Sequence, residues 1–577
     1  MSQSLHERLC GTEGITRILS DVIDNHLANK IIASRRQVTA FLIFVTFLAA
    51  VLPARASTAP TTDNLQVIVT STQSIGSSYL EVQAIMSGVV KRSDGSLGSY
   101  KVPLTILYPQ AAAQCNGLAI ADVVNSVFYE TFDFVGTAND PFFPALFPLG
   151  RMTLGDAFIQ GRGYVYAQAQ WNKLVIERQR EAGTLSDPTL HIDQGTDGYI
   201  ILRDLSAFLR APSEYWVGLA PCAVRDVIGF GYSQTGMLLR QFSFAKLNTR
   251  LANRPIFDDG LVFEASLQVV PGSRCRSLTD QSPWFAYTYN GCTGATPNSQ
   301  GKVITINTET DVQIINGWKA RPNGKSARDH YRLYELAGTS HIPSSLLPLK
   351  LVGIRPIEMA AQNYADTGPV LRAMVEHLRG WIEGINEPPV GTVLQGQVDH
   401  LTASLFSKSS WGNDNQLVYL FRSDADGNAL GGVRLANVRT TLPGGQEVGG
   451  PLGLYRGVEC NNDPSLSSFI LDCQLNGDSS IYNMAGGTFV PYTASNPGQC
   501  GLLYDSYESY LTDVANAATY AAAQGWILAE ELSSLVAAAA QKTQEYPGCI
   551  PTTSHGKQSE GEKPPVAAAR ERDERSD

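Results

Sequence analysis

Short apolar segments alternate with helical patterns through residues 65–350, and this alternation leaves few folds open to the chain. Strands are predicted at residues 65–70, 80–87, 100–108, 117–124, 163–169, 227–233, 261–270, 302–307 and 331–337. A helical spacing of apolar residues occurs at 202–209. Strands separated by helices indicate a mostly parallel sheet with helices on both faces. In such a sheet, functional groups collect where the strands reach their carboxyl ends.

The size and charge of the chain exclude some classes of function. Its 577 residues are 43% hydrophobic and 17% charged, which is enough apolar material for a large core. Lysine and arginine total 44 against 54 acidic residues, so the net charge is −10. Because nucleic-acid binders carry a basic stripe or patch, we expect no nucleic-acid partner.

The N-terminal region carries the features of an export signal. An arginine pair at residues 35–36 precedes an apolar run at 38–52, and residues 54–56 form an A-x-A pattern. This order is typical of a secretory signal, of either the general or the twin-arginine type. The apolar run is shorter than the ~20 residues of a membrane-spanning helix. We therefore predict a periplasmic or secreted protein that begins near Ser57 and has no membrane span after cleavage, with an uncleaved N-terminal anchor as the alternative.

Cysteine usage agrees with export. Cys10 precedes the signal, and the eight remaining cysteines are an even set, which suits disulfides in an oxidising compartment. They are Cys115, Cys222, Cys275, Cys292, Cys460, Cys473, Cys500 and Cys549. The chain has no C-x-x-C pair, which argues against a zinc site, and we expect no metal and no cofactor.

The pairing of these cysteines is only partly constrained. Short separations favour two local pairs, Cys275–Cys292 and Cys460–Cys473. Cys115 and Cys222 each lie a few residues before a predicted strand. If those two strands are parallel neighbours, the two cysteines meet at the amino edge of the sheet. The alternative is that several of the eight are buried free thiols.

Ser233 lies at a junction between a strand and a helix. The apolar run before it ends at Gly231, and a helical pattern begins after Gly236. A tight turn at such a junction exposes the serine hydroxyl at the sheet edge and points the helix N-terminus at the reacting centre. The arrangement is that of a nucleophile elbow, G-x-S-x-G, except that Thr235 stands where the second glycine is expected. The alternative is a glycine-rich turn with an ordinary serine.

Two further strands lead to residues that complete a hydrolytic site. Asp311 and His341 each follow the carboxyl end of a predicted strand. A serine hydroxyl becomes a nucleophile when an imidazole accepts its proton, and a carboxylate holds that imidazole in the right tautomer. The chain order Ser233, Asp311, His341 is that of α/β-hydrolases. Glu309, in the same loop as Asp311, is the alternative acid, and the two aspartates at 258–259 are the least favoured candidates.

Backbone N–H groups near Ser233 are expected to stabilise the oxyanion that forms during hydrolysis. One donor is the N–H of Gln234, the residue after the nucleophile. The second donor is expected in the loop after the strand at 117–124, where the N–H of Asn125 or of Ser126 is the candidate.

Several blocks of the chain resemble the large α/β-hydrolase-domain family whose elbow reads G-x-S-Q-[ST]-G. They are the elbow itself, residues 161–165 leading to Trp171, and residues 202–210, 334–341, 426–435 and 504–540. The resemblance covers about residues 65–545, and it implies a sheet of about eight strands and a triad of the serine, aspartate and histidine named above. It places Thr235 within the family's own variation. Residues 170–172, Gln-Trp-Asn, depart from the expected Gly-Trp-Gln.

The sequence divides into four parts. They are an N-terminal extension with the export signal at 1–56, an α/β-hydrolase core at 57–385, a C-terminal extension at 386–550 and a disordered tail at 551–577. The C-terminal extension is rich in glycine, proline and short β runs, and two helices follow at about 505–523 and 527–543. We expect this mixed β and helical extension to pack on the core or to cap its pocket.

These features predict an α/β protein with an α/β-hydrolase catalytic core, acting as an exported serine hydrolase. It is expected to cleave a carboxylic ester of a small molecule through an acyl-enzyme, with Ser233 as nucleophile, His341 as general base and Asp311 as the acid. An amidase, lactonase or polyester depolymerase on the same residues is an alternative. A non-catalytic binding protein of the same fold is another. The oligomeric state is left open.

Overall fold

The computed structural model of the chain describes residues 61–545 apart from several internal stretches. Within this range the undescribed residues are 93–94, 126–148, 186, 212–221, 245–246, 249–260, 270–300, 315–316, 322–329, 343–362, 401–416, 458–486 and 493–503. The expected export signal and the tail at 551–577 lie outside the described residues.

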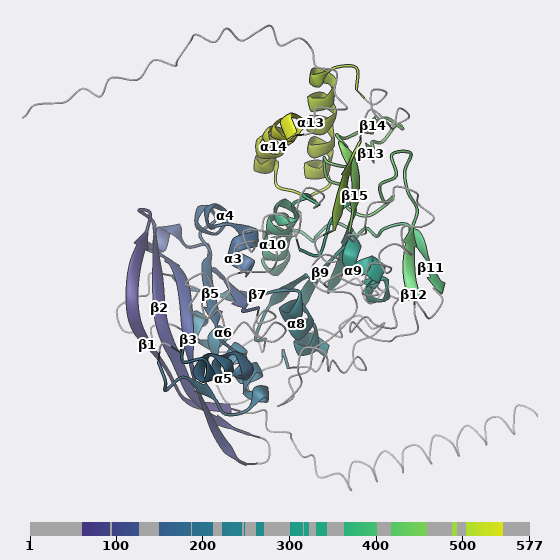
Figure 1. Cartoon of the computed structure of the whole chain (residues 1–577). Helices are drawn as coiled ribbons and strands as arrows, with labels where there is room; N and C mark the ends of the chain where they lie inside the picture. Colours follow the sequence, from purple (N-terminus) through teal and green to yellow (C-terminus); the bar gives the residue numbers. More distant parts are fainter. Residues whose placement is uncertain are drawn as a thin grey trace, which may run out of the picture. The chain divides into compact units, whose positions relative to one another are not determined.

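A mixed sheet of ten strands organises the fold (Figure 1). Three long antiparallel strands form one part: β1 (Thr61–Ile75), β2 (Tyr79–Lys91) and β3 (Leu97–Pro109). Six parallel strands continue the sheet in the order β5 (Val165–Ala169), β4 (Leu118–Val123), β7 (Asp226–Tyr232), β8 (Ala265–Val269), β9 (Lys302–Thr308) and β10 (Tyr331–Leu336). β5 joins the two parts by pairing antiparallel with β3. The tenth strand, β6 (His191–Ile192), also pairs with β3.

Strand β4 illustrates why these residues form the centre of a parallel sheet. All six of its side chains are buried, as in strands that are covered on both faces. Leu118 and Ile120 belong to the core on one face, and Ala119 and Ala121 belong to the core on the other. This alternation follows the two-residue repeat of a strand.

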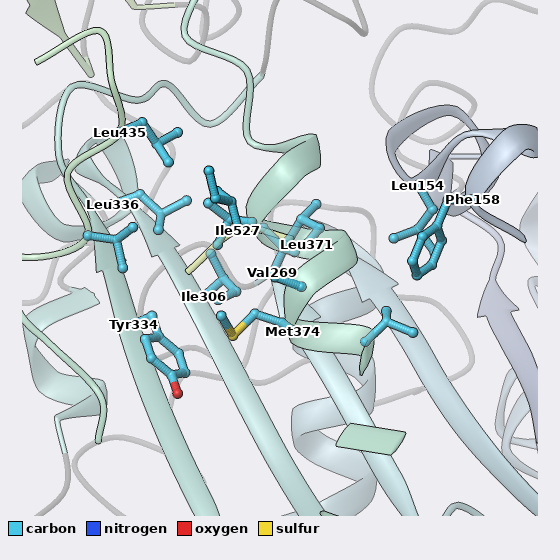
Figure 2. Packing of buried hydrophobic residues seen from close by; sticks show 14 of the residues in the cluster. Leu154, Phe158, Val269, Ile306, Tyr334, Leu336, Leu371, Met374, Leu435 and Ile527 are labelled. Atoms are coloured by element: carbon cyan, nitrogen blue, oxygen red, sulfur yellow. The ribbon is translucent and has the colours of Figure 1, made fainter. Parts of the chain in front are cut away.

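Helices cover both faces of the parallel strands. α3 (Leu149–Leu154), α4 (Asp156–Gly161) and α10 (Gly368–Ile382) contribute buried side chains to the core on one face. α5 (Lys173–Glu181), α6 (Gly198–Arg210) and α8 (Gln234–Phe244) contribute to the core on the other. Figure 2 shows Leu371 and Met374 of α10 beside the strands that carry Val269 and Ile306. The predicted α/β architecture, with a mostly parallel sheet between helices, is therefore confirmed.

Cys115 and Cys222 form a disulfide, as their positions ahead of two strands predicted. They precede β4 and β7, which are parallel neighbours, and their Cα atoms are 5.6 Å apart. Because the two cysteines are separated by 107 positions in the sequence, the bond closes a large loop at the amino edge of the sheet. The other six candidate cysteines lie outside the described residues.

In the C-terminal region, residues 386–545, the described part of the chain contains three strand pairs and two longer helices. The pairs are β11 (Gly396–His400) with β12 (Leu417–Phe421), β13 (Thr440–Thr441) with β14 (Glu447–Val448), and β15 (Gly453–Arg456) with β16 (Thr488–Pro491). The helices are α13 (Tyr507–Ala523) and α14 (Leu532–Glu545). Leu435 and Ile527 share a core cluster with Leu336 of β10 (Figure 2), and Val433 forms a parallel bridge to Leu336. The region therefore packs directly on the carboxyl end of β10.

Two expectations about the sheet were wrong. The sheet has ten strands rather than about eight, and β6 was missed because two residues are too few to show an alternating pattern. The strand predicted at 261–270 is confined to β8 (Ala265–Val269). Its first residues are diverted because the amide of Asn248 bonds to both the N–H and the carbonyl of Phe263, at 2.8 and 2.9 Å.

Neither a membrane span nor a metal centre is found in the part of the chain that the structure describes. No helix there combines the length and the apolar character needed to cross a membrane. No group of three or more His, Cys, Asp or Glu side chains there could hold a metal ion.

Candidate active site

Ser233 connects β7 to α8 in a strained turn. Its φ of 59° is the only positive φ of a non-glycine residue among those described. Such a left-handed backbone costs about 1–3 kcal/mol and persists only where the surrounding structure imposes it. Here the N–H of Ser233 donates to the carbonyl of Val269 at the end of β8, with 2.8 Å between nitrogen and oxygen. The turn places Ser233 at the carboxyl edge of the sheet.

Close packing of this turn explains the spacing of its glycines. A Cβ on Gly236 would lie 2.4 Å from the carbonyl oxygen of Val269. A Cβ on Gly231 would lie 2.6 Å from the carbonyl oxygen of Thr235. Helix α8 thus lies too close to β8 at position 236 to leave room for a side chain there, whereas position 235 accommodates the buried side chain of Thr235. The buried hydroxyl of Thr235 instead accepts from the N–H of Tyr232 and donates to its carbonyl, at 3.0 Å in each case.

His341 lies beside Ser233 on the loop that leaves β10. The distance between His341 Nε2 and Ser233 Oγ is 2.8 Å, and the imidazole is almost fully buried. The chain enters this loop at Gly338, whose φ of 65° favours glycine. The N–H of His341 donates to Thr310 Oγ1 at 3.0 Å, and its carbonyl accepts from the hydroxyl of Tyr232 at 2.7 Å. The backbone of the histidine is therefore fixed from two sides.

Asp311 lies on the other side of the imidazole. Its Oδ1 is 2.8 Å from His341 Nδ1. The contact has the length of a hydrogen bond but not its usual direction. Neither atom has another hydrogen-bond partner among the described residues. Hydrogen bonds of this kind often become aligned only when substrate binds. Asp311 Oδ2 accepts from the N–H and the hydroxyl of Thr308, at 2.9 and 2.8 Å. These bonds form a capping box that starts α9 (Glu309–Ile314) and orients the carboxylate.

Glu309, the alternative acid, is bonded to the backbone. Its Oε2 accepts from the N–H of Gly338 at 2.8 Å, and its Oε1 accepts from the N–H of Gly457 at 3.1 Å. Of the two acids in this loop, Asp311 is the one whose carboxylate lies against the imidazole of His341. Residues 258–259 lie outside the described residues.

Tyr232, which sequence reasoning did not single out, packs beside the imidazole. The centroids of the Tyr232 and His341 rings are 5.8 Å apart. Burial raises the pKa of Tyr232 well above its ordinary value, and the negative charge of Asp311 adds to this effect. The phenol therefore stays protonated and keeps its hydrogen bond to the His341 carbonyl. Its only sequence signal is its place directly before Ser233.

Two of the three predicted oxyanion donors are described. Gln234 begins α8, so its N–H belongs to the first turn of a helix, where N–H groups and the helix dipole favour negative charge. Gln234 is fully buried directly after Ser233. Ser126 lies outside the described residues, which leaves Asn125 as the described candidate on the β4 side.

The peptide group between Val124 and Asn125 is held in a defined orientation. Trp171 Nε1 donates to the carbonyl of Val124 at 2.7 Å. Because the C=O and N–H of a trans peptide point in opposite directions, the N–H of Asn125 is turned away from Trp171. The side chain of Asn125 donates to the carbonyl of Tyr232 at 2.8 Å, which connects this loop to the residue before Ser233.

A buried carboxyl group lies near the carboxyl end of β4. Asp122 Oδ2 accepts from Gln168 Nε2 at 2.7 Å and from the Tyr166 hydroxyl. The same oxygen accepts from the N–H of Gly150 at 3.1 Å. Burial raises the pKa of Asp122 to about 7, although the three hydrogen bonds act to lower it. Asp122 thereby connects β5 and the start of α3 to β4. The only feature of the sequence that points to Asp122 is its position as an acidic residue in an otherwise apolar strand.

The sheet order, the covering helices and the strand-end site together define an α/β-hydrolase fold. The chain belongs to the alpha/beta hydrolase family, because the family model of an alpha/beta hydrolase domain matches residues 152–537. The family resemblance inferred from the sequence is thereby confirmed. No curated protein matches the chain.

Solved structures similar to this chain include several hydrolases. A glucuronoyl esterase from Solibacter usitatus is 13% identical, with a TM-score of 0.24 over 45% of this chain and 70% of that one. A dienelactone hydrolase from Anabaena variabilis is 13% identical, with a TM-score of 0.25 over 50% of this chain and 93% of that one. A glucuronoyl esterase from Teredinibacter turnerae is 10% identical, with a TM-score of 0.22 over 44% and 64%. Similarity at this level says nothing of the substrate, and the fold assignment depends on the family match and the sheet topology.

Proposed function

We propose that the protein is a serine hydrolase that cleaves carboxylic esters. The main support for this proposal is the position of the His341 imidazole between the other two side chains. Its Nε2 lies 2.8 Å from Ser233 Oγ, and its Nδ1 lies 2.8 Å from Asp311 Oδ1. Membership of the alpha/beta hydrolase family supports hydrolysis as the reaction class. The strained backbone at Ser233 supports the choice of nucleophile, because strain of this kind gathers at functional sites.

In the proposed reaction, the hydroxyl oxygen of Ser233 attacks the ester carbonyl carbon while Nε2 of His341 accepts the hydroxyl proton. Asp311 orients the imidazole and stabilises the imidazolium through its negative charge. The tetrahedral intermediate then breaks its bond to the alcohol oxygen. The alcohol leaves with the proton from Nε2, and the acyl group stays on Ser233. Water attacks this acyl-enzyme with the same proton transfers, which releases the acid and restores the serine.

The oxyanion of the tetrahedral intermediate is assigned to the backbone N–H groups of Gln234 and Asn125. The Gln234 donor is supported by its place at the N-terminus of α8, where the helix dipole favours negative charge. The Asn125 donor is supported by the orientation that Trp171 imposes on its peptide group. Loss of one such donor typically costs roughly 3 kcal/mol of transition-state stabilisation.

We also propose that the protein acts outside the cytosol. The basis is the export signal predicted at residues 35–56. The disulfide between Cys115 and Cys222 supports the proposal, because disulfides persist in oxidising compartments. A small-molecule ester is the proposed substrate class.

Hydrolysis of p-nitrophenyl esters of increasing acyl length tests the proposed reaction. The variants are Ser233→Ala and, as a control, Ser243→Ala, which removes a buried serine hydroxyl from α8, the helix that begins directly after Ser233. We expect turnover by the wild type and by the control, and a loss of more than about a thousandfold in kcat for Ser233→Ala. Circular dichroism shows whether each variant is folded.

The outcomes separate the candidate functions. Activity that survives Ser233→Ala would contradict the site assignment. An absence of turnover together with an absence of fluorophosphonate labelling would favour a binding protein. Turnover of an amide, a lactone or a polyester in preference to simple esters would keep the site and change the substrate class.

A further inference from the structure

The loops that carry Asp311 and His341 are both connected to one residue of the C-terminal region, Gly457. The connection is made by the carboxylate of Glu309, two residues before Asp311. This carboxylate accepts from the N–H of Gly457 at 3.1 Å and from the N–H of Gly338 at 2.8 Å. Gly338 opens the loop that leads to His341. One buried side chain thus joins the acid loop, the histidine loop and the C-terminal region.

Thr310 makes a second connection among the same three segments. Its hydroxyl accepts from the N–H of His341 at 3.0 Å and donates to the carbonyl of Gly457. Both backbone polar groups of Gly457 are therefore bonded to side chains in the first turn of α9. Thr310 is fully buried, so a lost partner here would leave a buried polar group unsatisfied, which is costly.

The close approach at Gly457 leaves no room for a side chain. A Cβ on Gly457 would lie 2.4 Å from the backbone nitrogen of Thr310 and 2.8 Å from the backbone carbon of Glu309. Because these are backbone atoms, a larger residue would displace either α9 or β15, the strand that directly precedes Gly457. The short separation is what allows both hydrogen bonds to form.

The C-terminal region also supports the start of the histidine loop. The N–H of Ala337 donates to the carbonyl of Val433 at 3.0 Å, and the N–H of Val433 donates to the carbonyl of Glu335 at 2.8 Å. Tyr455 packs against the turn itself, since a Cβ on Gly338 would lie 3.0 Å from the Tyr455 Cβ. The path of the loop therefore depends on residues that come much later in the chain.

We infer that Glu309 and Thr310 are positioning residues, through which the C-terminal region holds the carboxylate of Asp311 against the imidazole of His341. This inference rests on the proposed function, because it assigns both residues to the same catalytic site. The two side chains act through the loops that they connect. The C-terminal region is accordingly a part of the site and not an accessory to it.

The hydrogen-bonding capacity of each side chain defines the variants that test the inference. Glutamine at 309 offers one acceptor and one amino group, so one of the two N–H groups bound by Glu309 would face another donor. Valine at 310 keeps the shape of Thr310 and loses the hydroxyl, whereas serine keeps the hydroxyl. Glu264→Gln is the matched control, because Glu264 is a buried glutamate at the amino edge of the sheet that accepts from the N–H of Val227 and pairs with Arg210.

The kinetic test compares kcat and KM for ester hydrolysis among these variants, with the folded fraction of each measured separately. We expect Glu309→Gln and Thr310→Val to lower kcat about 10- to 100-fold with KM changed less than about twofold, because small misplacements of catalytic groups have effects of this size. Thr310→Ser should recover most of the lost kcat, and Glu264→Gln should keep the wild-type value. Equal kcat values for Glu309→Gln, Thr310→Val and Glu264→Gln would overturn the inference.

A second kinetic variant tests the role of the C-terminal region itself. Gly457→Ala changes only a residue of that region, and we expect it to lower kcat as Glu309→Gln does. Gly161→Ala is its control, because a Cβ at Gly161 meets nothing within 4 Å. An unchanged kcat in Gly457→Ala would overturn the assignment of the C-terminal region to the site.

A spectroscopic measurement separates this inference from the proposed function. Nuclear magnetic resonance with isotope-labelled histidine reports the Nδ1–H of His341, whether or not the protein turns over an ester. A shift of this signal in Glu309→Gln and Thr310→Val, but not in Glu264→Gln, would support the inference. An identical signal in all of them would overturn it. If the wild type hydrolyses no ester, the proposed function fails while this signal still decides the positioning role.

Discussion

The buried carboxyl of Asp122 should make the free energy of unfolding depend on pH, and one substitution can measure this contribution. Its carboxyl is fully buried among neutral donors, and burial raises its pKa from 3.8 to about 7. The folded protein therefore retains a proton that the unfolded chain releases at lower pH. The stability that this proton contributes is fully present below about pH 4 and is lost as the pH rises to 7.

The size of the effect follows from the shift. A difference of about three pH units corresponds to about 4 kcal/mol in the free energy of unfolding. Part of this is already lost at pH 5, so the change between pH 5 and pH 8 is roughly 2–3 kcal/mol. Asp122→Asn introduces an amide of nearly the same shape that is neutral at every pH. Its oxygen can still accept from Tyr166, Gln168 and Gly150.

Urea unfolding of the wild type and of Asp122→Asn at pH 5, 6, 7 and 8 measures the effect. We expect the difference in unfolding free energy to move in favour of the variant by roughly 2–3 kcal/mol across this range, because the other titrating groups cancel. Asp197→Asn is the control, because this buried aspartate forms an ion pair with Arg92 at 2.6 Å. Loss of the ion pair should make this variant less stable than the wild type. A difference between wild type and Asp122→Asn that stays constant from pH 5 to pH 8 would show that the pKa of Asp122 is not raised by burial.

Two further predictions concern the disulfide and the oxyanion loop. Replacing Cys115 and Cys222 by alanine releases two residues that are 107 positions apart, so chain entropy predicts a loss of about 5 kcal/mol in unfolding free energy. Urea unfolding measures this loss, and an unchanged midpoint would contradict it. Trp171→Phe removes the N–H that holds the Val124 carbonyl, so kcat for ester hydrolysis should fall at least about tenfold with KM unchanged. A rise in KM with kcat unchanged would instead indicate a lost substrate contact.

The central sheet could be predicted because its strands carry their own signals. β4, β7, β9 and β10 are apolar runs bounded by polar turns, and each predicted range lies within one residue of the observed strand at both ends. The Cys115–Cys222 disulfide followed from the same prediction, since parallel neighbours bring their amino ends together. The start of the strand predicted at 261–270 could not be corrected from the sequence, because it depends on a side chain, Asn248, from an earlier segment.

At the candidate site, chain order predicted which residues meet but not what holds them. The side chains of Ser233, Asp311 and His341 are in contact, and their catalytic roles stay predictions. The hydroxyl of Thr235 bonds to the backbone of Tyr232, only three residues earlier. The G-x-S-x-G pattern does not predict the turn geometry that these bonds require. The bonds to Gly457 join positions 147 and 148 apart in the sequence, and no local pattern predicts a contact of that range.

In the proposed mechanism, His341 activates Ser233 as a nucleophile. Reaction with a fluorophosphonate, followed by location of the adduct by peptide mass spectrometry, tests this activation, because only an activated serine reacts rapidly. We expect a single adduct on Ser233 in the wild type. We also expect loss of that adduct in His341→Ala, which keeps the serine hydroxyl and removes the base. An adduct on another residue would show that Ser233 is not the nucleophile, and labelling of Ser233 that is unaffected by His341→Ala would show that His341 does not activate it.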